Sequence, residues 1–545
     1  MESFSYFDRP VIKNNMTSNQ YDVVIIGGGI TGAGIALDAV SRGMKVALAE
    51  KNDFSSGTSS KSTKLIHGGL RYLKQFHFKM VADVGKERRI VHNLAPHLVL
   101  PEKMLLPILK DSSMGKYSIS AGLKIYDMFA GVTGDDRRRM LNKRKTLETE
   151  PLLPIDKTTG SGLYAEYRTD DARLTLEIIK TAHSYGADLL NYVEVEDFIY
   201  EKGEIKGIEC YDHLEKENFA VRASQIVNAA GPWVDDLRNL NHSYLDKHLH
   251  ITKGIHLVFP REKLPVRQSI YFEIGDGRMI FIIPRDDTTY VGTTDTDYTG
   301  DKDNILVTKQ DAAYLIAAVN NIFPSINLIL EDVQSSWAGL RPLIAEEGKT
   351  ASEISRKDEI FISLTGLISI AGGKLTGYRK MAEKVVDIIA KNISHESFKN
   401  CRTTLLPLTG NKFDNYSHVL QYKEEVKERL KKIALPENYA SYLVHNYGIQ
   451  TDIILDDFEK QRGDDPENKL LWAELFFCIK NEMVCKPLDF IERRTGRLYF
   501  NINSIKKFSS QILEYFREKF SWPDTEYTSE SDKLQQYLKN ASHFE

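Results

Sequence analysis

The 545-residue sequence is poor in cysteine: it has only Cys210, Cys401, Cys478 and Cys485, and no two of them have CxxC spacing. Neither a disulfide framework nor a zinc ribbon is indicated, and a reducing compartment fits this composition. The sequence also lacks a run of about 18 apolar residues, and its first twenty residues contain no continuous apolar stretch. We therefore expect a cytoplasmic chain without a membrane span, although peripheral contact with the cytoplasmic membrane face stays open.

An excess of charge of one sign is missing as well. The 72 Lys and Arg residues against 76 Asp and Glu residues leave a net charge of −4, with 27% charged and 42% hydrophobic residues overall. This balance is typical of a globular protein and does not favour nucleic acid as a partner. The length predicts more than one domain.

Glycine becomes scarce towards the end of the chain. Of the 35 glycines, only Gly410, Gly448, Gly463 and Gly496 lie beyond residue 400, where amphipathic helical patterns run over 422–433, 470–481 and 505–520. The sequence therefore predicts a mainly helical C-terminal domain over 401–545, after a larger unit over 1–400.

Residues 21–50 carry the best-defined local signal. An apolar strand pattern over 23–26 meets the glycine-rich GGGITG, a helical pattern follows over 33–42, and a second strand pattern over 45–49 leads to Glu50. Gly27 suits a tight turn, Gly29 a close approach to a pyrophosphate, and Gly32 the packing of helix on strand. The helix N-terminus offers N–H donors to the anion, and Glu50 can accept from a ribose hydroxyl. This constellation predicts a dinucleotide site.

The middle of the chain alternates between two kinds of pattern. Helical patterns at 171–185 and 311–322 are interspersed with short β-rich runs at 226–228, 254–259, 279–283, 289–293 and 360–364. The mixture predicts an α/β nucleotide-binding domain interleaved with a sheet-rich second domain.

The glycines do not decide between FAD and NAD. The hydroxyl-rich loop SSGTSSKST at 55–63 follows Glu50 directly and would suit a long cofactor with many oxygens, although a surface loop would look similar.

Further motifs occur in a fixed order along the chain. They are KLIHGGLRYL at 64–73, NAAGPW at 228–233, GTTD at 292–295, GLRPL at 339–343 and GGKLTGYR at 372–379. Together with the fingerprint at 21–50, this series closely resembles FAD-dependent glycerol-3-phosphate dehydrogenases. The segment DFIERRT at 489–495 resembles the helical cap of that family.

The resemblance implies a fold and a reaction. The fold is α/β and D-amino-acid-oxidase-like: a Rossmann-type FAD-binding domain, an interleaved sheet-rich substrate domain that covers the flavin, and a C-terminal helical domain. The reaction, in glycerol catabolism, is the oxidation of sn-glycerol 3-phosphate to dihydroxyacetone phosphate, with electrons passing through FAD to a membrane quinone. A homodimer is an open expectation, since the sequence does not determine the oligomeric state.

The same resemblance extends the set of cofactor-binding residues beyond Gly27, Gly29, Gly32 and Glu50. It adds Thr58, Ser59, Lys64, Leu65, His67, Ala230, Gly231, Gly373, Leu375 and Thr376.

A substrate phosphate favours arginine, whose planar fork binds phosphate oxygens in pairs. Arg71 and Arg341 lie in glycine-rich motifs. By resemblance, Arg341 and Lys374 line the substrate pocket, with Arg71 and Tyr72 close by. Lys253, three residues before His256, is counted with these substrate-binding groups.

Alcohol oxidation also needs a group that accepts the hydroxyl proton, and histidine titrates near neutral pH. His67 lies in the cofactor loop and His256 at a predicted strand. Both stay candidates for the base, and Arg341 or Lys374 could stabilise the alkoxide. A metal site is not indicated, because no HExxH or comparable spacing accompanies the histidines.

Basic residues cluster at 137–139 and 143–145, beyond a mixed apolar segment at 105–130. Such clusters usually form a solvated face. The alternative is attraction to anionic lipid headgroups, which a quinone-reducing enzyme without a span would need.

Three other functions remain to be weighed. A glycerol-3-phosphate oxidase would use oxygen as acceptor and make hydrogen peroxide, with identical chemistry at the substrate. A non-catalytic or tRNA-modifying flavoprotein fits poorly with the acidic balance and the phosphate-type motifs. An amino-acid oxidase would need one carboxylate anchor, which Arg341 could supply, but two further basic groups suit a phosphate better.

Overall fold

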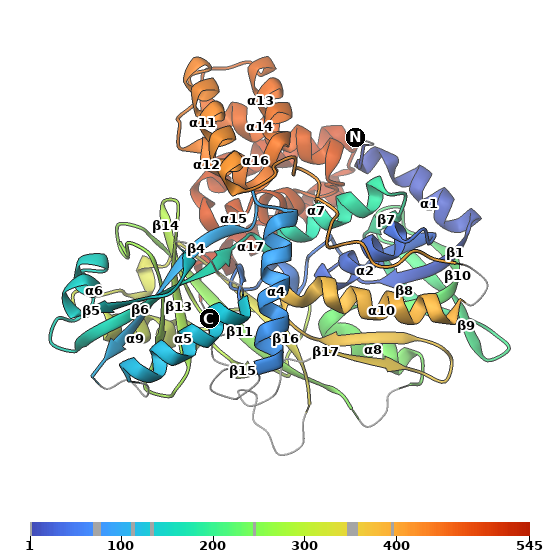
Figure 1. Ribbon diagram of the computed structural model, residues 1–545. Helices are drawn as coiled ribbons and strands as arrows, with labels where there is room; N and C mark the ends of the chain where they lie inside the picture. The colour runs from blue at the N-terminus through green and yellow to red at the C-terminus, as the bar shows by residue number, and fades with distance from the viewer. Residues whose placement is uncertain are drawn as a thin grey trace.

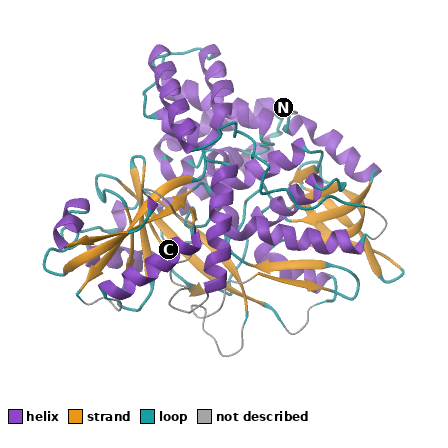
Figure 2. Ribbon diagram, viewed as in Figure 1, coloured by secondary structure: helices purple, strands orange, loops and turns teal. Residues whose placement is uncertain are grey.

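The computed structural model describes residues 3–68, 78–110, 115–130, 136–243, 247–345, 358–393 and 397–544. Two β-sheets lie on either side of the central helix α4 (Phe78–Leu94), and the C-terminal helices lie above them (Figure 1). The strands gather at the two ends of the lower part of the molecule, whereas the upper part is helical (Figure 2).

The first sheet has a parallel centre. Its strands run in the order β17 (Asp358–Ile362), β18 (Ile368–Gly372), β10 (Glu217–Asn228), β1 (Gln20–Ile26), β2 (Val46–Glu50) and β7 (Asp188–Asn191). The hairpin of β8 (Val193–Glu201) and β9 (Glu204–Asp212) joins the outer part of β10. Val23, Val24 and Ile25 of β1 are fully buried, as expected for a central parallel strand.

Helices pack against this first sheet. Helix α2 (Ile30–Ser41) follows β1 and packs between α7 (Asp171–Ser184) and α10 (Tyr378–Asn392). Helix α1 (Arg9–Ser18) lies against β7 and β10. The start of α7 is fixed by Asp170, whose side chain accepts from the backbone N–H of Arg173 at 3.2 Å.

The second sheet is built around the long strand β11 (Leu249–Pro260). This strand pairs with β16 (Ser335–Ile344), β14 (Thr288–Gly292) and β15 (Thr296–Asp297). Beyond β14 follow β13 (Met279–Arg285), β12 (Ser269–Glu273), β4 (Leu100–Leu109), β6 (Thr158–Arg168) and β3 (Leu65–Ile66), with β5 (Arg139–Asn142) also on β6. Helix α9 (Lys309–Ile322) packs on β11, and α5 (Lys116–Ala130) and α6 (Lys143–Thr149) pack on β6.

Chain segments alternate between the two sheets, so the predicted interleaving is confirmed. Short helices make the connections at the site: η2 (Thr58–Ser60), η4 (Gly231–Trp233) and η6 (Leu375–Gly377).

The last part of the chain is helical. It contains α11 (Tyr416–Lys432), α12 (Tyr439–Tyr447), α13 (Thr451–Lys460), α14 (Pro466–Asn481), the π-helix η8 (Asp489–Arg494), α15 (Arg497–Phe500), α16 (Ile502–Lys519) and α17 (Asp524–Ser542). Its apolar side chains share one core with the second sheet, as Leu443 and Phe490 do with Met104 and Tyr164. The domain boundary at residue 400 stays a prediction.

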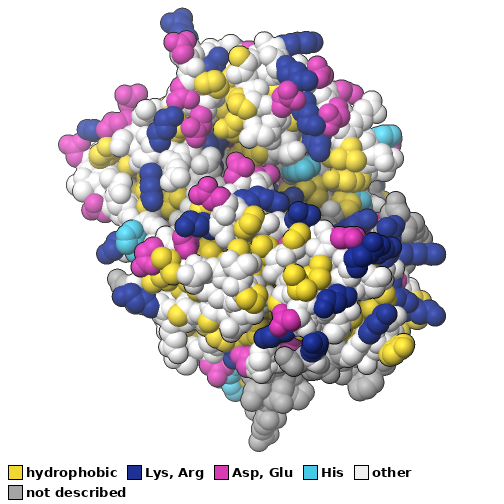
Figure 3. Space-filling model, turned by 90° about the vertical axis from the view of Figure 1, so that its left-hand side faces the viewer, with side chains coloured by type: hydrophobic (Ala, Val, Ile, Leu, Met, Phe, Trp, Pro, Cys, Tyr) yellow, Lys and Arg dark blue, Asp and Glu magenta, His cyan; other side chains and the backbone are white. Residues whose placement is uncertain are grey.

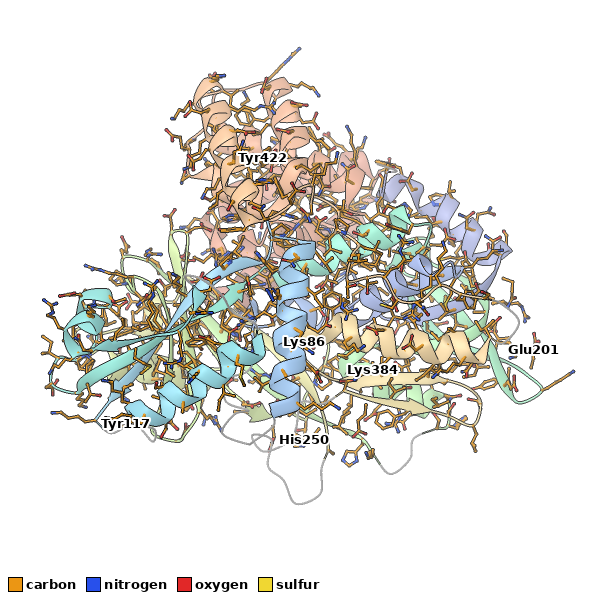
Figure 4. The ribbon with its side chains drawn as sticks, viewed as in Figure 1. Lys86, Tyr117, Glu201, His250, Lys384 and Tyr422 are labelled. Atoms are coloured by element: carbon orange, nitrogen blue, oxygen red, sulfur yellow. The ribbon has the colours of Figure 1, made fainter. Side chains whose placement is uncertain are left out.

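The described parts of the apolar segment 105–130 divide between the strand β4 and the helix α5. Leu105, Leu106 and Ile108 belong to β4 and are buried within the sheet. In α5, by contrast, Tyr117 is 89% and Met128 67% exposed. Tyr117 lies at the lower left edge of the view in Figure 4. Within the described ranges, none of the helices combines the length and the apolar character needed to cross a membrane.

His97 is fully buried where the C-terminal helices meet the rest of the molecule. Its ring lies 6.0 Å from that of Phe413 and close to Gly410 and Gly448. In the described part of the chain neither ring nitrogen has a hydrogen-bond partner. Burial, with the charges of Arg173 and Lys180 adding to it, lowers the pKa of His97 to about 3.

This buried histidine predicts a loss of stability on mild acidification. The folded state keeps His97 neutral, whereas the unfolded state takes up a proton once the pH falls below about 6.5. The free energy of unfolding should therefore drop by about 1.4 kcal/mol more between pH 7.5 and pH 5.5 in the wild type than in His97→Gln. Urea unfolding of the full-length protein at both pH values measures this difference. His248→Gln, at an exposed position, is the control and should lose as much stability as the wild type. An equal loss in His97→Gln would contradict the assignment.

Candidate active site

The turn between β1 and α2 is built on close backbone contacts. Gly27 has a φ of +109°, and a Cβ on it would lie 2.7 Å from the carbonyl oxygen of Ala229. A Cβ on Gly32 would lie 1.9 Å from the carbonyl oxygen of Gly27. Only glycine fits these two places, so the turn brings the N-terminus of α2 to the carboxyl edge of the sheet, where a pyrophosphate can approach it.

Glu50 and the hydroxyl-rich loop hold this turn from the side of β2. The carboxylate of Glu50 accepts from the backbone N–H of Gly28 at 2.7 Å, and burial raises its pKa. The Ser59 hydroxyl accepts from the N–H of Ile30 at 2.9 Å, while the Thr58 hydroxyl donates to the carbonyl of Leu340 in β16 at 2.7 Å. The loop thus joins the first sheet to the second.

A cavity of about 670 Å³ opens between these elements. Most of the residues predicted from the sequence line it: Gly27, Gly29, Glu50, Thr58, Ser59, Leu65, His67, Ala230, Gly231, His256, Arg341, Gly373, Lys374, Leu375 and Thr376. The structure therefore brings the glycine turn, the acid that follows it, and the basic and histidine side chains of the second sheet to one cavity.

His256 lies on β11 and is 2% exposed. Its Nε2 is 3.0 Å from the Thr63 hydroxyl, and its ring stacks on Trp337 at 4.7 Å with an interplanar angle of 13°. Gly292 of the neighbouring strand leaves room for the ring, since a Cβ there would lie 2.0 Å from the imidazole. Burial, with Arg341 and Lys64 adding to it, holds the pKa of His256 well below its usual 6.5. The imidazole is therefore neutral at pH 7.

Arg341 lies on β16 opposite Thr252 of β11. Its Nη1 donates to Asp295 at 3.2 Å and its Nη2 to the Thr293 hydroxyl at 2.7 Å. A Cβ on Gly254 would lie 2.0 Å from the guanidinium, so this glycine provides the space in which Arg341 lies. These contacts fix the plane of the Arg341 guanidinium, which is always charged, at the cavity wall.

His67 and the GGK segment meet at another wall. The backbone carbonyl of His67 accepts from the Thr376 hydroxyl at 3.2 Å. The centre of the His67 ring lies 5.9 Å from that of the Phe281 ring. Gly373, with φ +86°, lets the chain turn before Lys374. These contacts hold His67 and Lys374 to the same cavity.

Some predicted residues do not line the cavity. Gly32 packs α2 on β1, as its predicted role requires. The ammonium of Lys64 is held by Asp171 at 2.5 Å, and that of Lys253 by Asp311 of α9 at 2.6 Å. Both lysines therefore have a structural partner instead of a place in the pocket. Arg71 and Tyr72 lie outside the described residues.

Other residues at the cavity were not assigned from the sequence. Thr293, which lines the cavity, and Asp295, which binds Arg341 behind it, belong to the GTTD motif, to which the sequence assigned no role. Thr63 is the last residue of the hydroxyl-rich loop, and Tyr271 and Phe281 stack on each other at 4.3 Å in the cavity wall. Thr293 and Asp295 contact Arg341, and Thr63 contacts His256; a single sequence does not reveal such long-range contacts.

The family comparison agrees with this architecture. Residues 22–379 match the model of the FAD dependent oxidoreductase family, and residues 401–527 match the C-terminal domain of alpha-glycerophosphate oxidase. At Gly27 and Gly32 of the turn, a Cβ would collide with backbone atoms, so the turn leaves room for a close approach. This turn and the buried carboxylate of Glu50 beside it fit a dinucleotide. The chain therefore belongs to the FAD-dependent oxidoreductases, and its cofactor is FAD.

Relatives narrow the family further. An aerobic glycerol-3-phosphate dehydrogenase of Bacillus subtilis is 47% identical over 544 residues, which are 99% of this chain and 98% of the relative. The solved structure of a glycerol-3-phosphate dehydrogenase from Bacillus halodurans, complexed with FAD, is 42% identical, with a TM-score of 0.85 and 99% coverage of both chains. An L-alpha-glycerophosphate oxidase from Mycoplasma pneumoniae, at 18% identity and a TM-score of 0.56, covers 70% of this chain and 97% of its own, and shares the fold. Among the FAD-dependent oxidoreductases, this chain belongs to the aerobic glycerol-3-phosphate dehydrogenase family, as its motifs predicted.

Substitution at Gly32 should abolish FAD binding. In Gly32→Ala the new methyl group would collide with the backbone of Gly27, so the turn must move away from the pyrophosphate position. We expect purified Gly32→Ala to have lost most of its flavin absorbance per chain. Gly122→Ala is the control, because a Cβ there meets nothing within 4 Å, and it should retain FAD. Full FAD content in Gly32→Ala would contradict the proposed turn.

Proposed function

We propose that this chain oxidises sn-glycerol 3-phosphate to dihydroxyacetone phosphate in glycerol catabolism and passes the electrons to a quinone. The observation that carries the substrate assignment is the guanidinium of Arg341, held rigidly by Asp295 and Thr293 in the cavity that His256 also lines. The names of the most similar relatives support the same substrate.

Phosphate binding is the task of the basic side chains. A guanidinium with a fixed plane presents N–H groups in a fork that matches two phosphate oxygens. Lys374 of the same cavity supplies a second positive charge. Two cations match the double negative charge of a phosphate ester better than the single charge of a carboxylate. The pair therefore favours a phosphate ester over an amino acid as the substrate. Arg71 and Tyr72 remain proposed neighbours of the phosphate.

Proton removal is the task of a histidine, and we favour His256 over His67. His256 is neutral at pH 7 and lines the same cavity as Arg341 and Lys374. It can therefore accept the hydroxyl proton while Arg341 and Lys374 stabilise the negative charge on the substrate. Bound FAD supplies the hydride acceptor.

The proposals of a quinone as electron acceptor and of membrane contact are supported by the surface around α5. Its outer face carries the exposed Tyr117 and Met128. Arg138 joins this helix to the basic cluster, since its backbone N–H donates to Asp127 at 2.7 Å and its side chain to Ser120 at 3.1 Å. Arg137, Arg139 and 143–145 are exposed nearby, and basic side chains can be seen along one side of this end of the molecule in Figure 3. Apolar and basic groups together suit an anionic membrane surface in which a quinone dissolves.

A peroxide-forming oxidase is the second candidate. It is favoured by the match of residues 401–527 to the C-terminal domain of alpha-glycerophosphate oxidase. The substrate side would be the same in both enzymes, so the acceptor must be measured.

The substrate assignment predicts a spectroscopic change. Under anaerobic conditions glycerol 3-phosphate should bleach the flavin band of the holoenzyme, whereas glycerol, which lacks the phosphate, should not at equal concentration. Arg341→Met should weaken substrate binding by about 2 kcal/mol, or about thirtyfold, because a charge-assisted contact is lost. Its FAD content should stay near that of the wild type.

Arg222→Met provides the matched control, since Arg222 forms an exposed ion pair with Glu201. It should bind substrate as the wild type does. Bleaching by glycerol as readily as by its phosphate, or wild-type affinity in Arg341→Met, would refute the phosphate site.

The acceptor assignment predicts faster turnover with quinone than with oxygen. One purified sample should be assayed with a soluble quinone analogue and in air-saturated buffer, with hydrogen peroxide followed in the second assay. We expect the quinone rate to exceed the oxygen rate. Stoichiometric peroxide at a rate equal to or above the quinone rate would establish the oxidase instead.

A further inference from the structure

Side chains of the C-terminal helices reach the cofactor loop at Lys61. The ammonium of Lys61 contacts the Tyr499 hydroxyl and the Glu492 carboxylate, and the Tyr499 hydroxyl in turn donates to Glu492 at 2.6 Å. The second carboxylate oxygen of Glu492 accepts from Arg493 at 2.5 Å. Glu492, Arg493 and Tyr499, here called the C-terminal junction, are all buried.

The loop at Lys61 touches His256 on two sides. The backbone carbonyl of Lys61 accepts from Nε1 of Trp337 at 3.2 Å, and Trp337 stacks on the His256 ring. Two residues on, the Thr63 hydroxyl lies 3.0 Å from His256 Nε2. The backbone carbonyl of Thr63 is itself held by the Tyr290 hydroxyl at 3.2 Å. The stretch 61–63 therefore sets both the plane and the edge of the imidazole.

The C-terminal helices also support Trp337 directly. The ring of Tyr499 lies 5.1 Å from that of Trp337, and the ring of Phe500 lies 5.9 Å from it. The backbone carbonyl of Tyr499 accepts from the Ser335 hydroxyl of β16 at 2.5 Å. A single residue, Tyr499, thus contacts Lys61 through its hydroxyl and the histidine's stacking partner through its ring.

The contact with Thr63 fixes one edge of the His256 ring. Its Nε2 lies 3.0 Å from the Thr63 hydroxyl, whereas Nδ1 is fully buried and has no hydrogen-bond partner in the described part of the chain. A change at Thr63 would therefore alter the surroundings of Nε2 and the position of the ring.

We infer that the C-terminal junction positions His256 for catalysis: Tyr499 and Glu492 hold Lys61, and through it Thr63 and Trp337 hold the imidazole. This inference rests on the proposed function, in which His256 accepts the hydroxyl proton. Thr63, Trp337, Glu492 and Tyr499 are positioning residues, since they act through His256. The C-terminal helices then contribute to the chemistry without touching the substrate.

The test compares two tyrosines that differ in what they hold. Tyr499→Phe keeps the ring on Trp337 and removes only the hydroxyl at Lys61. Tyr447→Phe is the matched control, because the buried Tyr447 hydroxyl donates at 2.9 Å to Glu474, which pairs with Arg497 in the same helical part but away from Lys61. Both variants lose one hydroxyl from a buried glutamate and arginine pair.

The measurement is single-turnover reduction of the holoenzyme flavin by glycerol 3-phosphate under anaerobic conditions. We expect the limiting rate constant to fall about tenfold in Tyr499→Phe, because the imidazole is less well oriented. The substrate concentration at half the limiting rate should change less than about twofold, since Arg341 is untouched. Tyr447→Phe should keep the wild-type rate constant, even if its melting temperature falls as far as that of Tyr499→Phe.

Thr63 offers a second set of variants should Tyr499→Phe fold poorly. Thr63→Val keeps the shape and loses the hydroxyl, so its rate constant should fall, whereas Thr63→Ser should restore it. In the double variant, Tyr499→Phe should add little to Thr63→Val, because both act through one imidazole. Full additivity, or a slow Thr63→Ser as well as a slow Thr63→Val, would overturn the positioning role of Thr63.

The outcomes separate the inference from the function on which it rests. If glycerol 3-phosphate fails to bleach the wild type, the proposed function fails and the inference falls with it. If the wild type bleaches and Tyr499→Phe reacts at the same rate, the inference alone is wrong. If Tyr447→Phe slows as much as Tyr499→Phe, the C-terminal helices have only a general structural role, and the inference is again wrong.

Discussion

The loop after β2, which lies beside the glycine turn, depends on the ion pairs of the buried carboxylate of Asp53. This carboxylate accepts from Arg493 at 2.5 Å, from Arg494 and from Asn191 at 2.9 Å. Burial alone would raise the pKa of Asp53, but the guanidinium groups of Arg494 and Arg493 outweigh it and hold the pKa below its usual value. A buried charge is tolerated only while its partners stay in place, and loss of one partner typically costs about 3–5 kcal/mol. The helix η8 and the loop after β2 are therefore fixed to each other.

This constraint extends from Glu50 to Thr63. The loop is held at Asp53 and at Lys61 by side chains of the C-terminal helices, and between these points Ser59 and Thr58 bind the start of α2 and strand β16. The same loop therefore touches the glycine turn proposed to bind FAD and the histidine of the second sheet. Because FAD binds the folded arrangement and not the unfolded chain, its binding free energy must also stabilise the contact with the C-terminal helices.

Local patterns could be predicted from the sequence, and long-range pairing could not. The glycine turn and Glu50 were located correctly because their spacing reflects one βαβ unit. Lys253 was assigned to the substrate although it is three residues from His256, an odd separation that in a strand puts the two side chains on opposite faces. Its partner Asp311 lies on α9, 58 residues away. The roles of Thr293 and Asp295 likewise depend on the pairing of β11 with its neighbours, which no single-sequence pattern reveals.

The alternation along β11 lets one strand serve both the core and the cavity. Ile255 and Leu257 point to the apolar core beneath α9, while Gly254 and His256 face the cavity. A slip of one residue would exchange these sets, placing Ile255 in the cavity and the imidazole in the core. The pairing of β11 with β16, from Leu249 opposite Ile344 to Val258 opposite Ser335, prevents such a slip. It also puts Trp337 beside His256 and Arg341 beside the space left by Gly254. The register of a single antiparallel pair therefore determines which side chains enter the apolar core and which line the cavity.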